Sequence, residues 1–170
     1  MKKLFLVFTI ASLTFVACNN KTSDSGETTT ETTTETAPAE TPESNVATVE
    51  LNAGDDMKYD LSEIVVEAGQ TVKLTLHHTG QSPATTMGHN FVLLKAGVDF
   101  DKFVLATATA TEATDHIPAD HAADVIAHTK TIGGGESTEI EFPAPPAGTY
   151  DFLCSFPGHA ALMKGKFIVE

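Results

Sequence analysis

The chain has 170 residues, 41% of them hydrophobic, and a formal net charge of −13. This length allows one compact domain with extensions, and the apolar fraction is sufficient for a core. From residue 46 onward, seven lysines and no arginine face 17 acidic residues, a net charge of −10, which disfavours a nucleic-acid partner because binding to phosphates requires clustered positive charge.

The first 17 residues have the order of an export signal. Two lysines precede an apolar run of about 14 residues, shorter than the roughly 20 needed to cross a bilayer, and small residues precede Cys18. The ending FVAC resembles the lipobox of bacterial lipoproteins. This resemblance implies a signal peptide at residues 1–17, a lipid anchor on Cys18, and an exported, membrane-anchored protein that faces the periplasm or the cell surface. A Cys18–Cys154 disulfide is the alternative.

Residues 18–45 are predicted to be a disordered tether behind this anchor. The segment is rich in threonine and glutamate and contains no aromatic residue. Such a composition cannot bury enough apolar surface to offset the entropy of ordering. As a flexible coil, the segment would span on the order of 30 Å.

Residues 46–170 are predicted to form an all-β domain. Seven short segments are rich in β-branched and aromatic residues, and alternation is visible in TVKLTL, where Val72, Leu74 and Leu76 share a face. These segments are 46–53, 62–68, 70–79, 89–95, 137–142, 148–154 and 165–170. Their spacing predicts an antiparallel sandwich of two sheets.

One short helix is predicted between the strands, where the stretch 98–127 interrupts their succession. Asp99 supplies an N-cap, Phe100, Phe103 and Val104 follow at helical spacing, and Pro118 provides a stop. Threonine, a weak helix former, is frequent in this stretch.

The run CSFPGHAALM contains three candidate metal ligands within ten residues. In the strand before it, Tyr150, Phe152 and Cys154 point the same way, so the thiol lies at the inner face of the strand end. A Pro-Gly turn then reverses the chain and brings His159 and Met163 back toward the thiol. The three side chains can therefore converge.

His89, at a glycine turn 65 residues before Cys154, supplies a fourth candidate ligand. Two imidazoles, one thiolate and one weak thioether favour copper in a blue electron-transfer site. Zinc is the closest competing metal, but structural zinc sites commonly use two or more cysteines or a full set of Cys and His. A nucleophilic Cys154–His159 pair, and a core role for Cys154 and Met163 with incidental histidines, are the alternatives.

The run CSFPGHAALMKG, together with MGHNF and VIAHTKTIGGGES, resembles the azurin family of bacterial blue copper proteins over essentially all of residues 46–170. The resemblance implies a Greek-key cupredoxin sandwich and one copper ion that alternates between Cu(I) and Cu(II). The implied copper ligands are His89, Cys154, His159 and Met163, with the Gly88 carbonyl as a weak axial contact. The sequence lacks the cysteines of the azurin disulfide, and Phe91 stands where azurins generally carry tryptophan.

The resemblance also implies roles around the ligands. Asn90 would connect the two ligand loops, and the backbone amides of Asn90 and Phe156 would point at the cysteine sulfur. The implied docking patch around His159 consists of Met87, Phe156, Pro157 and Leu162. His78 corresponds to a buried histidine near the copper, whereas His116 and His121 are interpreted as incidental surface residues.

The sequence therefore predicts a type 1 (blue) copper protein that is not an enzyme. It would carry one electron at a time between redox proteins of the cell envelope, such as c-type cytochromes or copper-containing enzymes. A copper-binding or delivery module without an electron-transfer role is the main alternative. A purely adhesive sandwich domain, in which the four ligands would be dispensable, is another.

Overall fold

The structure is a computed structural model that describes residues 45–170. The predicted signal peptide, the Cys18 anchor and the tether up to residue 44 lie outside the described residues. None of the helices among residues 45–170 has both the length and the apolar character that a membrane-spanning helix needs.

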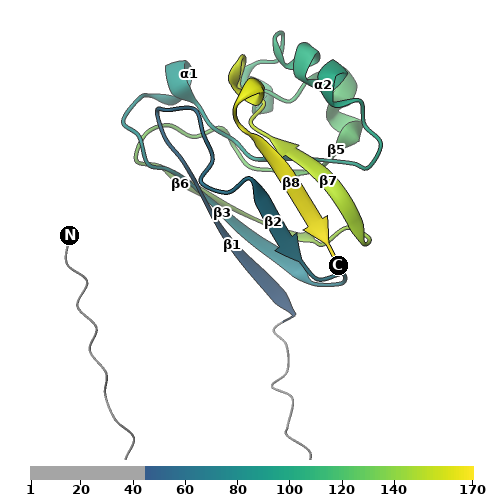
Figure 1. Cartoon of the computed structure of the whole chain (residues 1–170). Helices are drawn as coiled ribbons and strands as arrows, with labels where there is room; N and C mark the ends of the chain where they lie inside the picture. The colour runs from purple at the N-terminus through teal and green to yellow at the C-terminus, as the bar shows by residue number, and fades with distance from the viewer. Residues whose placement is uncertain (1–44) are drawn as a thin grey trace, which may run out of the picture. The chain divides into compact units, whose positions relative to one another are not determined.

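Two sheets face each other (Figure 1). The smaller sheet has the order β1-β3-β6, with β1 at Val46–Ala53, β3 at Thr71–His78 and β6 at Ser137–Pro143. The larger sheet has the order β2-β8-β7-β4-β5, with β2 at Glu63–Val66, β8 at Lys164–Val169, β7 at Gly148–Leu153, β4 at Val92–Leu94 and β5 at Val125–His128. This arrangement confirms the predicted two-sheet sandwich.

The strand pairing differs from the prediction in two respects. β1 pairs with β3 in parallel and β2 pairs with β8 in parallel, so the prediction of an antiparallel sandwich was wrong for these pairs. Side-chain alternation reports which face of a strand is buried and carries no information on the direction of its neighbour. β5 was not predicted, because all four of its residues are partly or fully exposed and no alternation marks it.

The core lies between the sheets. β3 alternates along its whole length, and Val72, Leu74 and Leu76 are completely buried. Phe152 on β7 and Phe167 on β8 are also completely buried and belong to the same cluster. Each such side chain contributes about 1.5–3 kcal/mol by leaving water, so this cluster holds the two sheets together.

Two short α-helices lie between strands, α1 at Ala84–Met87 and α2 at Phe100–Thr107. The predicted N-cap of α2 is confirmed, since the Asp99 carboxylate accepts a hydrogen bond from the Lys102 amide at 3.2 Å. The helix ends at Thr107, well before Pro118, and α1 was not predicted. Three 3₁₀ segments follow along the chain, at Glu112–Thr114, Ala119–Asp124 and His159–Ala161.

α2 covers the outer face of the larger sheet. Phe103 belongs to a second apolar cluster with Val92 and Leu94 of β4 and Leu153 of β7, all nearly or completely buried. Leu93, between the two β4 residues, belongs to the main core. β4 is thus buried on both faces, which explains why its three residues are all apolar rather than alternating.

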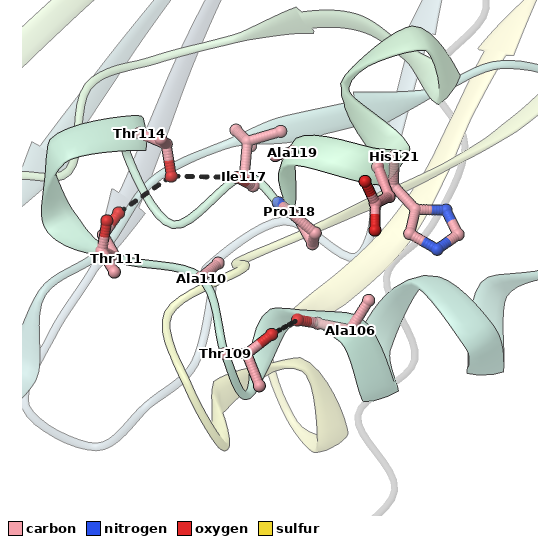
Figure 2. Close-up of a pocket in the computed structure, with 10 residues that line it drawn as sticks. Ala106, Thr109, Ala110, Thr111, Thr114, Ile117, Pro118, Ala119 and His121 are labelled. Carbon is pink, nitrogen blue, oxygen red and sulfur yellow. Dashed lines mark hydrogen bonds between the residues drawn. The ribbon is translucent and has the colours of Figure 1, made fainter.

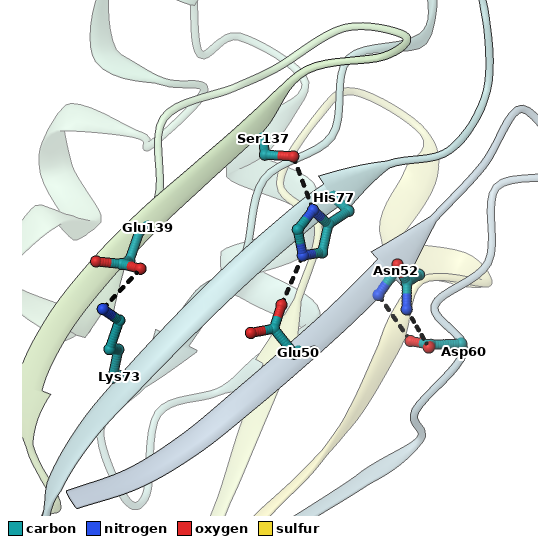
Figure 3. A network of polar contacts seen from close by, with 7 residues as sticks. All are labelled: Glu50, Asn52, Asp60, Lys73, His77, Ser137 and Glu139. Atoms are coloured by element: carbon teal, nitrogen blue, oxygen red, sulfur yellow. Dashed lines mark hydrogen bonds and ion pairs between the residues drawn. The ribbon is translucent and has the colours of Figure 1, made fainter.

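The outer face of the smaller sheet carries a polar ladder (Figure 3). The His77 ring lies between Glu50 and Ser137, at 2.6 and 2.7 Å, and Lys73 forms an ion pair with Glu139 at 3.1 Å. Such exposed pairs contribute about 0–1 kcal/mol each. The ladder therefore keeps this face solvated and adds little to stability.

Candidate metal centre

Three of the predicted ligands meet in one buried cluster. One ligand atom from each of His89, Cys154 and His159 lies within 4.8 Å of the other two. His89 and Cys154 are completely buried and His159 is 4% exposed. Residues 45–170 contain no other group of three His, Cys, Asp or Glu side chains so arranged. The structure thus brings together residues that are up to 70 positions apart in the sequence.

The Cys154 thiol lies at the end of β7, and His159 lies in the loop that follows. Cys154 directly follows β7, and its amide donates to the Met163 carbonyl at 3.0 Å, which closes the loop between them. Inside the loop, the amides of His159 and Met163 donate to the carbonyls of Phe156 and His159 at 3.0 and 2.9 Å. These short-range bonds make the loop a compact unit attached to the strand.

His89 is held with one nitrogen free. Its Nε2 lies 2.9 Å from the Gly54 carbonyl, which can only accept, so Nε2 carries the ring proton. Nδ1 is buried and has no hydrogen-bond partner. Burial lowers the pKa of His89, which keeps the ring neutral. A buried imidazole nitrogen with a free lone pair is what a metal ligand requires.

Cys154 is a buried free thiol at the centre of the cluster. Its Sγ lies 3.7 Å from Nδ1 of His159 and 3.9 Å from the Gly88 carbonyl oxygen. Burial raises its pKa to about 11, while hydrogen bonds from the backbone amides of Asn90 and Phe156 act in the opposite direction. Without metal the thiol is protonated at neutral pH, and a soft cation would displace that proton.

His159 is also neutral at physiological pH. Burial, and then the nearby His89, His116 and His78, lower its pKa to about 4. Two neutral imidazoles beside one thiol form a donor set that suits copper. The residues present therefore fit a copper ion.

The two predicted weak ligands adjoin the cluster. Met163 is completely buried and its backbone is bonded to both Cys154 and His159. Gly88 is tightly enclosed: a Cβ there would lie 2.5 Å from the Ala84 carbonyl oxygen and 2.9 Å from the Phe156 ring. Only glycine lets the chain before His89 approach this closely.

Asn90 joins the loop before β4 to the loop after β7. Its Oδ1 accepts from the Ser155 amide at 2.9 Å, and its Nδ2 donates to Ser155 Oγ at 2.8 Å and to the Asp115 carbonyl at 2.7 Å. Asn90 and Ser155 are both completely buried. The two ligand loops therefore share one fully satisfied polar network.

A second imidazole, that of His78, packs against the ring of His89. The His78 ring stacks on the His89 ring at a centroid distance of 4.4 Å. Its Nδ1 accepts from the Gly80 amide at 3.1 Å, and its Nε2 lies 2.8 Å from the Met87 carbonyl. Both ring nitrogens of His78 thus have a backbone hydrogen-bond partner.

The interpretation of His116 as a surface residue was wrong. His116 is only 8% exposed, and its ring packs edge-on against Phe156 at 4.8 Å. Asp115 and His116 both adopt a left-handed backbone, with φ of 49° and 58°. Positive φ is uncommon for non-glycine residues even though Asp and His are enriched there, so the residue types alone do not predict this backbone. His121 is half-buried and pairs with Asp124 at 2.8 Å.

The predicted docking patch is partly open to solvent. Leu162 is 58% exposed, Pro157 is exposed, and Met87 and Phe156 are half-buried. The Phe156 ring lies 4.6 Å from the His159 ring. Apolar side chains thus adjoin the ligand that retains a small exposed edge.

A cavity of about 360 Å³ lies elsewhere, between α2 and the 3₁₀ segments that follow it (Figure 2). The hydroxyls of Thr109 and Thr114 that line it donate to carbonyls of their own turns. Figure 2 shows these bonds within the cavity wall. The cavity contains no ligand of the buried cluster, so it is separate from the metal centre.

A two-sheet sandwich with a buried His-Cys-His group between two loops defines the cupredoxin class of metal-binding proteins. Comparison with family models identifies the family. Residues 45–170 match the family of copper binding proteins, plastocyanin/azurin family. This chain belongs to that family, which confirms the resemblance drawn from its ligand loop and establishes copper as the cofactor.

Individual relatives agree with this assignment. Outer membrane protein H.8 of Neisseria gonorrhoeae is 46% identical over 123 residues, 71% of this chain and 64% of that protein. Azurin-2 of Alcaligenes xylosoxydans xylosoxydans is 44% identical over 125 residues, 70% of this chain and 92% of that protein. The chain thus spans less than two thirds of the length of the H.8 protein.

Solved structures show the same fold. Auracyanin A, described as a "blue" copper protein from Chloroflexus aurantiacus, superposes with a TM-score of 0.66 at 34% identity, covering 74% of this chain and 99% of that chain. An azurin from Methylomonas sp. strain J gives a TM-score of 0.65 at 32% identity, covering 72% and 97%.

Proposed function

We propose that this chain is a type 1 copper protein that carries single electrons between redox partners in the cell envelope. The observation that carries the proposal is the buried Nδ1 of His89, which has no hydrogen-bond partner and lies beside the Cys154 thiol and the His159 imidazole. An unpartnered buried nitrogen costs free energy unless something binds it. A copper ion would satisfy it.

The proposed ligands are His89, Cys154 and His159, with Met163 and the Gly88 carbonyl as weak axial contacts. Copper, when bound, supplies the exchange of one electron between Cu(II) and Cu(I). The chain contributes a cluster held by the backbone bonds of the Cys154–Met163 loop and by the Asn90–Ser155 bonds. Ligands held in this way would move little when the charge of the copper ion changes by one.

Electrons would enter and leave through the edge of His159, with the docking patch of Met87, Phe156, Pro157 and Leu162 as the contact surface. An apolar patch of this kind suits a small, short-lived interface. The partners we propose are redox proteins such as c-type cytochromes or copper-containing enzymes. The chain itself would not be an enzyme.

We further propose that the domain is held at a membrane by lipid on Cys18 and faces the periplasm or the cell surface. Support comes from the lipobox-like ending FVAC and from the similarity to a protein described as an outer membrane protein. Mass spectrometry of the membrane fraction tests this proposal. Acyl chains on Cys18 are expected, and an unmodified chain that begins at Met1 would contradict it.

The carrier function is tested by the electron self-exchange rate of the copper-loaded protein. Leu162→Glu places a charge in the patch and should slow self-exchange at least severalfold, because two negatively charged patches repel. Leu105→Glu is the matched control, since Leu105 is 77% exposed on α2 and does not belong to the docking patch. Negligible exchange by the wild-type protein, with ready release of copper to a chelator, would favour a delivery module instead.

A further inference from the structure

The two tyrosines of this chain make the same kind of hydrogen bond at opposite ends of β7. The Tyr59 hydroxyl donates to the Asn90 carbonyl at 2.5 Å, and the Tyr150 hydroxyl donates to the Pro146 carbonyl at 2.6 Å. Asn90 adjoins Ser155 at the metal-centre end, whereas Pro146 precedes the start of the strand. Only Tyr59 is thus bonded to a ligand loop.

The acceptor of the Tyr59 bond occupies a central position. The Asn90 amide points at the Cys154 sulfur, and the Asn90 side chain makes two bonds to Ser155, the residue after the cysteine. Asn90 is completely buried. A displacement of its backbone would therefore change both the hydrogen bond to the Cys154 sulfur and the position of the loop after β7.

Tyr59 approaches Asn90 from a rigid loop between β1 and β2. The loop is closed by a bridge between Ala53 and Tyr59, and the Asn52 amide and side chain both donate hydrogen bonds to the Asp60 carboxylate. The Tyr59 ring packs on Phe152 at 5.6 Å. Burial raises the pKa of Tyr59 well above its ordinary value, so the hydroxyl keeps its proton and acts as a donor.

The same loop also orients a ligand. Gly54, five residues before Tyr59, supplies the carbonyl that holds Nε2 of His89. The β1–β2 loop therefore contacts two consecutive residues of the opposite loop, His89 through a backbone carbonyl and Asn90 through the tyrosine hydroxyl. These two contacts fix the chain that carries the upstream ligand.

We propose that Tyr59 is a positioning residue of the copper centre: its hydroxyl holds the Asn90 backbone so that the Asn90 amide stays directed at the Cys154 sulfur. This inference rests on the proposed copper function. A hydrogen bond to a thiolate sulfur withdraws negative charge from it and so favours the reduced metal. Tyr59 would thereby tune the reduction potential without touching copper.

The test compares Tyr59→Phe with Tyr150→Phe in the copper-loaded full chain. Both variants keep the aromatic ring and lose one hydroxyl bonded to a backbone carbonyl, so both should lose similar stability. Only Tyr59→Phe should shift the Cu(II)/Cu(I) ratio at a fixed solution potential, about two- to tenfold toward Cu(II), the range that one hydrogen bond of typical net strength supplies. It should also displace the visible absorption maximum. Equal ratios and spectra in the two variants would overturn the inference.

A second measurement separates failure of this inference from failure of the copper function. In the metal-free full chain, hydrogen exchange at the Asn90 and Phe91 amides should accelerate in Tyr59→Phe and stay unchanged in Tyr150→Phe. Unchanged exchange in both variants contradicts the positioning role, whether or not copper binds. If the wild-type protein forms no blue copper complex while exchange at Asn90 still depends on Tyr59, the proposed function fails and the role of Tyr59 in holding the loop stands.

Discussion

Asn90 and Ser155 lie 65 residues apart in the sequence and are joined by two hydrogen bonds, of 2.9 Å from the Ser155 amide and 2.8 Å to the Ser155 hydroxyl. One residue follows His89 and the other follows Cys154. The bonds therefore connect the two segments that carry the proposed ligands. Hydrogen bonds within the chain thus contribute to bringing His89 close to Cys154 and His159.

The first prediction concerns this connection. Asn90→Ala removes three hydrogen bonds, two of them buried, and leaves the Ser155 amide without its partner. The free energy of unfolding of the metal-free protein should fall by about 2–4 kcal/mol, measured by urea denaturation. Asn52→Ala removes a bond to Asp60 at the surface and is the control, with a smaller expected loss. Equal losses would mean that Asn90 does not link the loops.

The second prediction concerns the enclosure of Gly88. In Gly88→Ala the new methyl group meets the Ala84 carbonyl, the Thr131 side chain and the Phe156 ring at less than 3.0 Å. Relief of these contacts must move the backbone before His89, at a cost of about 1–3 kcal/mol in stability. Copper affinity should fall as well, because His89 shifts with that backbone. Wild-type stability and copper affinity in this variant would contradict the geometry described for the loop.

The third prediction concerns acid. Burial lowers the pKa of His159 from 6.5 to about 4, and it lowers the pKa of His89 as well. Between pH 6.5 and about pH 4 the unfolded chain therefore binds more protons than the folded metal-free protein, so stability decreases as the pH falls through this range. Below the folded-state pKa of about 4, His159 causes no further loss.

Urea denaturation of the metal-free protein at several pH values between 4 and 7 measures this dependence. His159→Gln should reduce the slope, since its side chain does not titrate. His89→Gln should also reduce the slope, because burial lowers the pKa of His89 as well. If all three proteins show the same slope, the buried imidazoles of His159 and His89 are not the cause.

The metal cluster was predictable because its signal is local. Cys154, His159 and Met163 fall within one short loop after a strand with clear alternation, and the spacing of this loop is specific. His89 was found because it stands at a glycine turn that opens a predicted strand, and the family resemblance then implied the same residue. The metal centre was thus predicted mainly from cysteine, histidine and methionine side chains placed at or near turns.

The supporting residues were not predictable in the same way. Tyr59 reaches Asn90 from a loop 31 residues away, and nothing in the composition of that loop marks the contact. His116 is buried because a left-handed backbone at Asp115 and His116 turns its ring onto Phe156. Such contacts depend on how distant loops pack. β5 was not predicted because its residues, three half-buried and one exposed, show no alternation of burial.

The central claim is that His89, Cys154 and His159 bind one copper ion through a thiolate. Titration of the metal-free full chain with Cu(II), followed by visible absorption, tests it most directly. We expect an intense blue colour from thiolate-to-copper charge transfer that saturates at one equivalent and is absent in Cys154→Ser. A colourless copper complex of the wild-type protein, or a blue colour that persists in Cys154→Ser, would contradict the account.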